Sequence, residues 1–238
     1  MRVEDLIAAH VLPIALCAKS GNDYKPLGIV GTGFTFGEGT FVTCWHCVAA
    51  PPSDGQAYGA AVREGGVFSA RYSHIYELVD LAQDTNASDL AIARLGVTVE
   101  PTLSLADAPF AWGHSVVAVG YPLPSALGTA TDEPTFLTSA RVLRGYVTRI
   151  IVDDRPGWPP IRAYELDMTA PPGISGSPLL DAEGPVVGGV VYGRTQDIVP
   201  KSESDELTYA FATAHHLDTL RAATGPATGG RRLEDYLR

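Results

Sequence analysis

The feature that most constrains the fold of this 238-residue chain is the spacing of its turns. Short runs rich in Val, Thr, Tyr and Phe alternate with glycine, proline and asparagine, a pattern that favours β-strands over long helices. The chain carries 25 glycines and 18 prolines to supply these turns, and its 45% hydrophobic content suffices for one large core or two small ones. The sequence therefore predicts a globular, mostly β protein.

The predicted strands fall into two groups of about six. The first group comprises residues 11–17, 28–36, 39–44, 57–63, 67–80 and 90–95. The second comprises residues 115–121, 136–152, 161–168, 177–180, 186–192 and 207–213. Residues 101–113 between them lack periodicity and contain two prolines, which indicates a connector. Because closure removes exposed strand edges, each group predicts a closed sheet.

We therefore expect an all-β fold of two six-stranded antiparallel β-barrels packed together with a C-terminal helix. Residues 1–113 form the first domain, residues 114–213 the second, and residues 214–238 a helix and tail. The apolar spacing of residues 214–223 predicts that helix. The polar segment 194–206 is expected to be a loop, and residues 2–10 a short helical turn.

Charge and cysteine content restrict the partners and the compartment. A formal net charge of −10 argues against nucleic acid and anionic membranes as partners. Glu4 and Asp5, close to Met1, argue against a secretory signal, and no long apolar span follows. The three cysteines are an odd number, so we expect free thiols and a cytoplasmic location. Cys44 and Cys47 lack the second ligand pair of a zinc site, so we expect no metal.

A serine between two glycines is the first candidate for chemistry. In the segment 171–181, Ser175 is flanked by Ile174 and Gly176, with Gly173 one residue earlier. Glycine turns expose main-chain N–H groups, which suits a nucleophile beside an oxyanion site. The structural alternative is an ordinary Gly/Ser/Pro turn leading into a strand.

A nucleophilic serine needs a base and a group that orients the base. Of the six histidines, only His46 ends an apolar strand beside small residues. His10 and His74 alternate with apolar residues and are expected to be packed or half-exposed, whereas His215 and His216 fall on the predicted helix. Asp89 directly precedes the buried-looking run 90–93, and a buried carboxylate requires a partner.

Three strings carry a family resemblance: residues 31–34 with 42–47, residues 89–92, and residues 173–178. In this order the chain resembles trypsin-like serine endopeptidases of the chymotrypsin fold over nearly its whole length. The resemblance implies Ser175 as nucleophile, His46 as general base and Asp89 as its orienting group. It also implies an oxyanion hole formed by the N–H groups of Gly173 and Ser175, an acyl-enzyme, protein or peptide substrates, and no cofactor.

The departures from the family pattern are informative. Zymogen members of the family carry an aspartate at this position, and it receives the freed N-terminus on activation. This chain has Ile174 there, so the resemblance does not imply that route of activation. Ile174 and Ser177 instead resemble the bacterial branch that includes glutamyl endopeptidases. Cys47 matches the cysteine that follows the family's histidine, but the strand expected to carry its disulfide partner offers Thr32 and Gly33.

The resemblance also places a substrate pocket. Thr169 stands where trypsin-type enzymes hold their basic-residue anchor, and no histidine occurs near Val191 as in the glutamyl enzymes. With Ala170, these residues imply an uncharged pocket for a small or apolar side chain. Tyr192 and Gly193 complete the predicted pocket strand, and Gly193 is expected to pair with an extended peptide.

Two functions remain open at this point. The first is a serine endopeptidase, expected to be intracellular and regulated by a partner protein or by mobile loops. The second is a catalytically silent descendant that binds peptides or a partner protein through the same groove. The presence of Ser175, His46 and Asp89 together favours the enzyme, because a binding role does not require all three.

Overall fold

The computed structural model describes residues 10–37, 39–63, 72–97, 103–122, 140–153, 161–201 and 205–238. Its strands are β1 (Val11–Ser20), β2 (Asp23–Thr35), β3 (Thr40–Cys44), β4 (Gln56–Arg63), β5 (Tyr72–Gln83), β6 (Leu90–Leu95), β7 (Ser104–Leu105), β8 (Ser115–Gly120), β9 (Arg141–Asp153), β10 (Ile161–Leu166), β11 (Pro178–Asp181), β12 (Val186–Lys201) and β13 (Asp205–His215). Its helices are the 3-10 helices η1 (Trp45–Cys47) and η3 (Pro226–Thr228) and the α-helices α2 (Leu217–Ala222) and α3 (Leu233–Tyr236).

The first six strands close into a barrel in the order β1-β2-β3-β6-β5-β4. Every pair in it is antiparallel, and strands that follow one another within β1-β2-β3 and β4-β5-β6 are joined by short connections, as antiparallel pairs permit. Apolar side chains fill the interior, and Ile14, Phe34, Phe41 and Ile92 are fully buried there. All five residues of β3 are buried, which fixes the strand that leads to His46.

The second barrel has the order β11-β8-β9-β10-β13-β12, and the β11–β12 pairing closes it. Short β7, inside the predicted connector, joins this sheet by pairing in parallel with β12. The predicted pair of six-stranded barrels is therefore confirmed, and the connector contributes one additional short strand.

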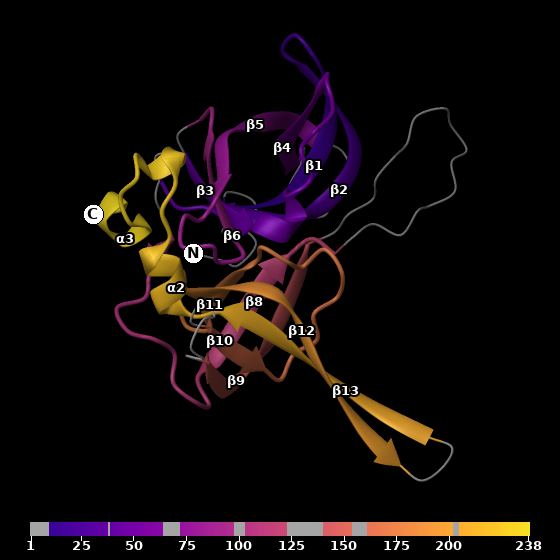
Figure 1. The fold of residues 1–238 in the computed structure, drawn as a ribbon, viewed down its shortest axis with the longest axis vertical. Helices are drawn as coiled ribbons and strands as arrows, with labels where there is room; N and C mark the ends of the chain where they lie inside the picture. Colours follow the sequence, from indigo (N-terminus) through magenta and orange to yellow (C-terminus); the bar gives the residue numbers. More distant parts are fainter. Residues whose placement is uncertain are drawn as a thin grey trace.

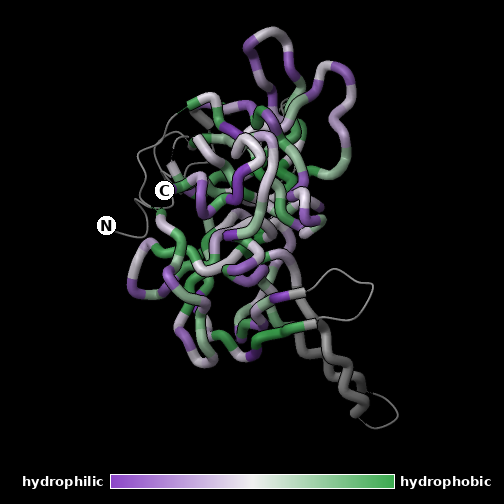
Figure 2. Tube along the Cα trace, turned by 60° about the vertical axis from the view of Figure 1, so that its left-hand side comes forward, coloured by the Kyte–Doolittle hydropathy of each residue, from purple (hydrophilic) through white to green (hydrophobic). Residues whose placement is uncertain are grey.

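The two barrels lie one above the other, with the C-terminal helices along one side of both (Figure 1). Hydrophobic stretches of the chain run through both barrels, and hydrophilic residues colour many of the outer turns (Figure 2). One continuous apolar core crosses from the first barrel into the second through Val119, Tyr121 and Val190. The junction between the barrels is thus packed, and segments from both can be held in fixed register there.

Several strand ends differ from the predictions by a few residues, and two differences change the type of element expected. Residues 194–206 do not form a loop throughout, because β12 continues to Lys201 and pairs with β13 from Asp205 onward. The resulting two-stranded ribbon extends away from the second barrel (Figure 1). The C-terminal helix begins at Leu217 rather than 214, because β13 runs to His215 and His216 caps the helix. The helical turn predicted for residues 2–10 lies, apart from His10, outside the described residues.

None of the helices in the described ranges has the length and apolarity needed to cross a membrane.

Candidate active site

Strand register brings His46 and Asp89 together. Cys44, at the end of β3, pairs with Leu90, at the start of β6. The residues that follow and precede this pair are therefore neighbours, and Trp45 N–H donates to the Asp89 carbonyl at 2.9 Å. The chain then turns into η1, which carries His46 out of the barrel wall.

The Asp89 carboxylate holds His46 at two points. Asp89 Oδ1 accepts from the main-chain N–H of His46 at 2.9 Å, and Oδ2 accepts from His46 Nδ1 at 2.6 Å. The side chains are 48% and 31% exposed, so the pair lies at the protein surface rather than in the core. A base held through Nδ1 presents Nε2 as its free nitrogen, which is the arrangement a general base needs.

Residues 84–89, here called the aspartate turn, are organised by Asp84, which the sequence analysis did not single out. Its carboxylate is buried and accepts from Asn86, Ser88 and Thr224. In the sequence, residues 84–89 read as an ordinary polar turn between two strands, and nothing in that pattern indicates that Asp84 is buried. The only sequence hint is the pair of acids at 84 and 89 on either side of short polar residues.

Residues 171–177, here called the serine turn, are held by main-chain contacts. Gly176 N–H donates to the Val191 carbonyl at 2.8 Å, and Ser177 N–H to the Ile174 carbonyl at 3.0 Å. Gly173 and Gly176 have φ angles of 91° and 88°, which side-chain-bearing residues rarely adopt. A Cβ at Gly176 would also overlap the carbonyl oxygen of Thr32. These two glycines are therefore required by the shape of the turn.

Thr32 of the first barrel is inserted into this turn of the second barrel. Its N–H donates to the Ser175 carbonyl at 2.9 Å, and its hydroxyl donates to the Gly173 carbonyl at 2.9 Å. The same hydroxyl accepts from Tyr121 N–H at 2.8 Å. Ser175 is thereby fixed next to the segment that carries His46.

The Ser175 hydroxyl donates to the main-chain carbonyl of Tyr192 at 3.4 Å. Among the described residues it forms no hydrogen bond to His46, an arrangement common in proteases without bound substrate. The N–H groups of Gly173 and Ser175 likewise have no acceptor among the described residues. Two main-chain donors beside the hydroxyl are thus available to a ligand.

Two histidines near the site, His46 and His215, have pKa values shifted in opposite directions. The hydrogen bond to Asp89 raises the pKa of His46 above its ordinary value of 6.5, and the Cys47 side chain raises it further. Burial instead lowers the pKa of His215 to about 4. The His215 ring lies against Tyr192 with centroids 4.4 Å apart, and its Nε2 has no hydrogen-bond partner within the part of the chain that the structure describes. His215 therefore stays neutral while His46 gains proton affinity.

All three cysteines are free thiols, and two of them, Cys44 and Cys47, lie beside the site. Donor atoms of Cys44, His46 and Asp89 lie within 4.8 Å of one another, a spacing that could admit a metal ion. However, Cys44 Sγ donates to the Val191 carbonyl at 3.3 Å, and His46 Nδ1 is bound to Asp89. Burial also raises the pKa of Cys44 well above its ordinary value, which disfavours the thiolate a metal requires. These residues fit a hydrogen-bonded pair better than a metal centre.

The structure corrects the residue expected opposite Cys47. A Cβ placed on Gly31 would lie 3.1 Å from Cys47 Cβ, so Gly31, and neither Thr32 nor Gly33, faces that cysteine. Cys47 lies in η1, after β3 has ended, so the residue that faces it cannot be counted along the pairing of β2 with β3.

The predicted pocket residues are only partly gathered at the serine. Tyr192 reaches Ser175 through its carbonyl, and Val191 is buried in the core of the second barrel. Thr169 is exposed and Ala170 half-buried, just before the serine turn. Gly193 is half-buried and follows an irregularity in the pairing of β12 with β13.

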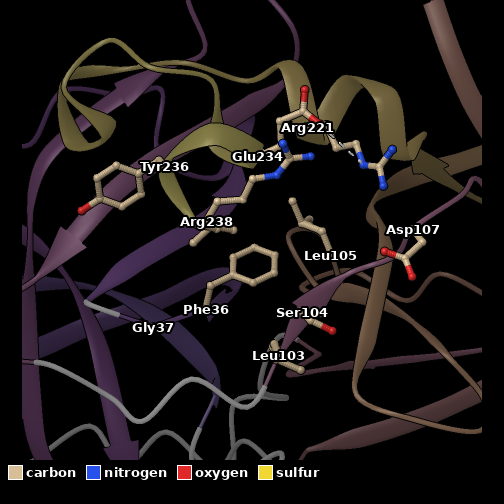
Figure 3. Close-up of a pocket in the computed structure, with 11 residues that line it drawn as sticks. Phe36, Gly37, Leu103, Ser104, Leu105, Asp107, Arg221, Glu234, Tyr236 and Arg238 are labelled. Atoms are coloured by element: carbon tan, nitrogen blue, oxygen red, sulfur yellow. Dashed lines mark ion pairs between the residues drawn. The ribbon is translucent and has the colours of Figure 1, made fainter.

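A separate cavity of about 510 Å³ lies between the first barrel, β7 and the C-terminal segment. Figure 3 shows Phe36 and Leu105 near its centre, with Arg221 and Glu234 on one side and Asp107 on another. None of Ser175, His46 and Asp89 lines it. This cavity is therefore not the proposed catalytic groove.

The remaining histidines have structural contacts of their own. His114 stacks on Phe110 and pairs with Asp181, His74 packs against Tyr76, and His10 contacts the Thr35 carbonyl. His216 accepts from Asp218 N–H at the start of α2. The prediction that His215 and His216 lie on a helix is wrong, because one ends β13 and the other caps α2.

The two barrels, packed together, have the architecture of the chymotrypsin fold. A family model described as a trypsin-like peptidase domain matches residues 31–188, and the chain belongs to this family. The protein is accordingly a trypsin-like serine endopeptidase. The narrower resemblance to glutamyl endopeptidases stays a prediction.

Solved structures with the same fold have low sequence identity. The active form of the Rv3671c protease from M. tuberculosis is 19% identical, with a TM-score of 0.57 over 90% of this chain and 78% of that chain. Deg5 is 20% identical, with a TM-score of 0.58 over 90% and 87%. The MamO protease domain from Magnetospirillum magneticum is 15% identical, with a TM-score of 0.56 over 90% and 95%. A search of curated proteins found no match.

Proposed function

We propose that the protein hydrolyses peptide bonds through an acyl-enzyme on Ser175. His46 takes the serine proton as general base and returns it to the leaving amine, while Asp89 orients His46. The N–H groups of Gly173 and Ser175 stabilise the oxyanion. The observation that supports this proposal most directly is the double hydrogen bond from His46 to a single carboxylate.

The substrate side of the proposal rests on β12. The Tyr192 carbonyl lies beside the Ser175 hydroxyl and can accept an N–H from an extended peptide, with Gly193 continuing the pairing. Thr169, Ala170 and Val191 bear no charge, so we propose a small or apolar side chain at the residue before the scissile bond. A library of peptide substrates that varies only this residue tests the preference.

Labelling with a fluorophosphonate, followed by mass spectrometry of the adduct, tests the mechanism. We expect the label on Ser175, its complete loss in Ser175→Ala, and a loss of several orders of magnitude in His46→Ala. Ser177→Ala is the matched control, because Ser177 lies two residues away and its buried hydroxyl has no partner among the described residues. Peptide binding without labelling or cleavage would favour the catalytically silent alternative.

Regulation and location belong to the same proposal. Three free thiols fit a reducing compartment, and we propose that the enzyme acts in the cytoplasm. An enzyme in that compartment requires restraint, which we assign to a partner protein or to loops at the groove. Labelling that appears only after addition of cell lysate would support the partner, whereas full labelling of the isolated protein would contradict it.

A further inference from the structure

We propose that Asp84 is a positioning residue for Asp89 and that it ties the aspartate turn to the C-terminal segment at Thr224. This inference rests on the proposed roles of Ser175, His46 and Asp89. Asp84 is not proposed to touch substrate and acts only through its neighbours.

The Asp84 carboxylate is a buried group with an unusual number of hydrogen bonds. It is 3% exposed. Its Oδ1 accepts from Asn86 N and Nδ2 at 3.2 Å each and from Thr224 N at 2.9 Å, and its Oδ2 accepts from Ser88 Oγ at 2.7 Å. A buried carboxylate is costly unless such donors surround it. The turn is therefore built around this group.

The donors fix the residues that lead directly into Asp89. Ser88, which donates to Asp84, is the residue before Asp89, and its carbonyl accepts from Gln83 Nε2 at 3.0 Å. Asp84 N–H donates to the Leu90 carbonyl at 2.9 Å, on the other side of Asp89. Both neighbours of Asp89 are thus bound to Asp84.

The C-terminal segment also binds the aspartate turn, although Thr224 lies 140 positions from Asp84 in the sequence. Thr85 N–H donates to the Thr224 carbonyl at 3.2 Å, and the hydroxyls of the two threonines are also hydrogen-bonded. Asn86 Nδ2 donates to the Ala222 carbonyl at 3.0 Å. Ala223 and Leu233 anchor this segment in the core that it shares with the first barrel.

The consequence concerns the geometry of the His46–Asp89 pair. Displacement of a reacting group by about 1 Å can reduce a rate about a hundredfold. Loss of an Asp84 oxygen leaves Ser88 or Thr224 without its acceptor, which allows Asp89 to move away from His46. Since the hydrogen bond to Asp89 raises the pKa of His46, that pKa then falls toward 6.5. A purely structural role for Asp84 predicts lower stability with no change in the titration of His46.

The test measures the titration of the His46 imidazole by NMR together with fluorophosphonate labelling between pH 6 and pH 10. His46→Gln identifies the resonance. In Asp84→Asn we expect a lower His46 pKa, a labelling profile shifted to lower pH, and a maximal rate reduced about tenfold to a hundredfold. Thr224→Pro, which removes one donor to Asp84, is expected to shift the pKa in the same direction.

Two controls separate positioning from stability. Ile14→Val lowers stability from inside the first barrel without touching the turn, and Asp23→Asn removes an exposed acid elsewhere. Both should leave the His46 titration unchanged. The other groups that face His46, namely Asp89, Cys47 and His215, are unaltered in all these variants.

The outcomes distinguish this inference from the proposed function. An unchanged His46 pKa in folded Asp84→Asn would overturn the inference even if Ser175 labels normally. Absence of labelling in the wild-type protein would count against the proposed function, whereas a lowered His46 pKa in Asp84→Asn would still support the positioning role.

Discussion

The aspartate turn and the serine turn hold their central residues by opposite means. The aspartate turn is organised by one side chain, since the Asp84 carboxylate collects donors from three residues. The serine turn is organised by main-chain hydrogen bonds and by two glycines at positive φ. We therefore expect the aspartate turn to be disrupted by loss of the Asp84 carboxylate. The serine turn should instead be disrupted by a Cβ added at one of its two glycines.

The largest expected effect breaks the serine turn. Gly176→Ala places a methyl group against the Thr32 carbonyl at a φ of 88°, which we expect to cost about 3 kcal/mol or more of unfolding free energy and to abolish labelling of Ser175. Urea denaturation and fluorophosphonate labelling measure the two effects. Near wild-type stability would mean that the turn is not held as tightly as its main-chain contacts indicate.

The next prediction concerns the loss of protein stability in acid. We assign much of this loss to His215, a buried histidine near the His46–Asp89 pair. His215 has its folded pKa lowered to about 4, so the unfolded state binds the proton first as pH falls below 6.5. Its contribution to stability is full above pH 6.5 and is lost progressively toward pH 4, by about 3 kcal/mol. His215→Phe, measured by denaturation across this range, should flatten the dependence.

His74→Phe is the matched control for this substitution. Both histidine rings lie 4.4 Å from a tyrosine ring, but His74 is exposed and His215 buried. Some acid sensitivity should persist in His215→Phe, because burial also lowers the pKa of His10 and His216. An identical pH dependence in the two variants would refute the assignment to His215.

A third variant crosslinks β2 to η1, which carries His46, beside the serine turn. Gly31→Cys places a thiol opposite Cys47, between the segment that carries His46 and the Ser175 carbonyl. The Cβ separation of 3.1 Å is slightly shorter than in typical disulfides, so only a small shift is needed. We expect the oxidised form to be about 2 kcal/mol more stable than the reduced form of the same variant. Denaturation with and without reductant measures the difference, and equal midpoints would contradict the placement.

The smallest effect concerns the aspartate turn alone. Ala87 is exposed and has a φ of 58°, which a glycine adopts at lower cost. Ala87→Gly is therefore expected to stabilise the protein by about 0.5 kcal/mol without changing the labelling rate. A reduced labelling rate would show that the turn depends on the Ala87 main chain as well as on the Asp84 side chain.

The two turns also differ in how far the sequence predicted them. Glycines around Ser175 require a particular backbone, so the serine turn could be read locally. Asp84 resembles any acid in a polar turn, and its most distant partner, Thr224, is far away in the sequence. The spacing of the strands predicted both barrels because turn-forming residues such as glycine and proline flank nearly every strand. The prediction of the residue opposite Cys47 was wrong because Cys47 lies in η1, beyond the end of β3, where strand register no longer applies.

The insertion of Thr32 into the serine turn, together with the contact of Thr224 with Asp84, has a consequence for synthesis of the chain. On the proposed mechanism, Ser175 cannot be positioned until the second barrel has closed onto the first. Asp89 cannot be positioned until the chain has been synthesised as far as residue 224. A growing chain would therefore carry His46 and Asp89 through most of its synthesis without peptidase activity. Nearby unfolded segments of the same chain would be spared from cleavage until assembly is complete.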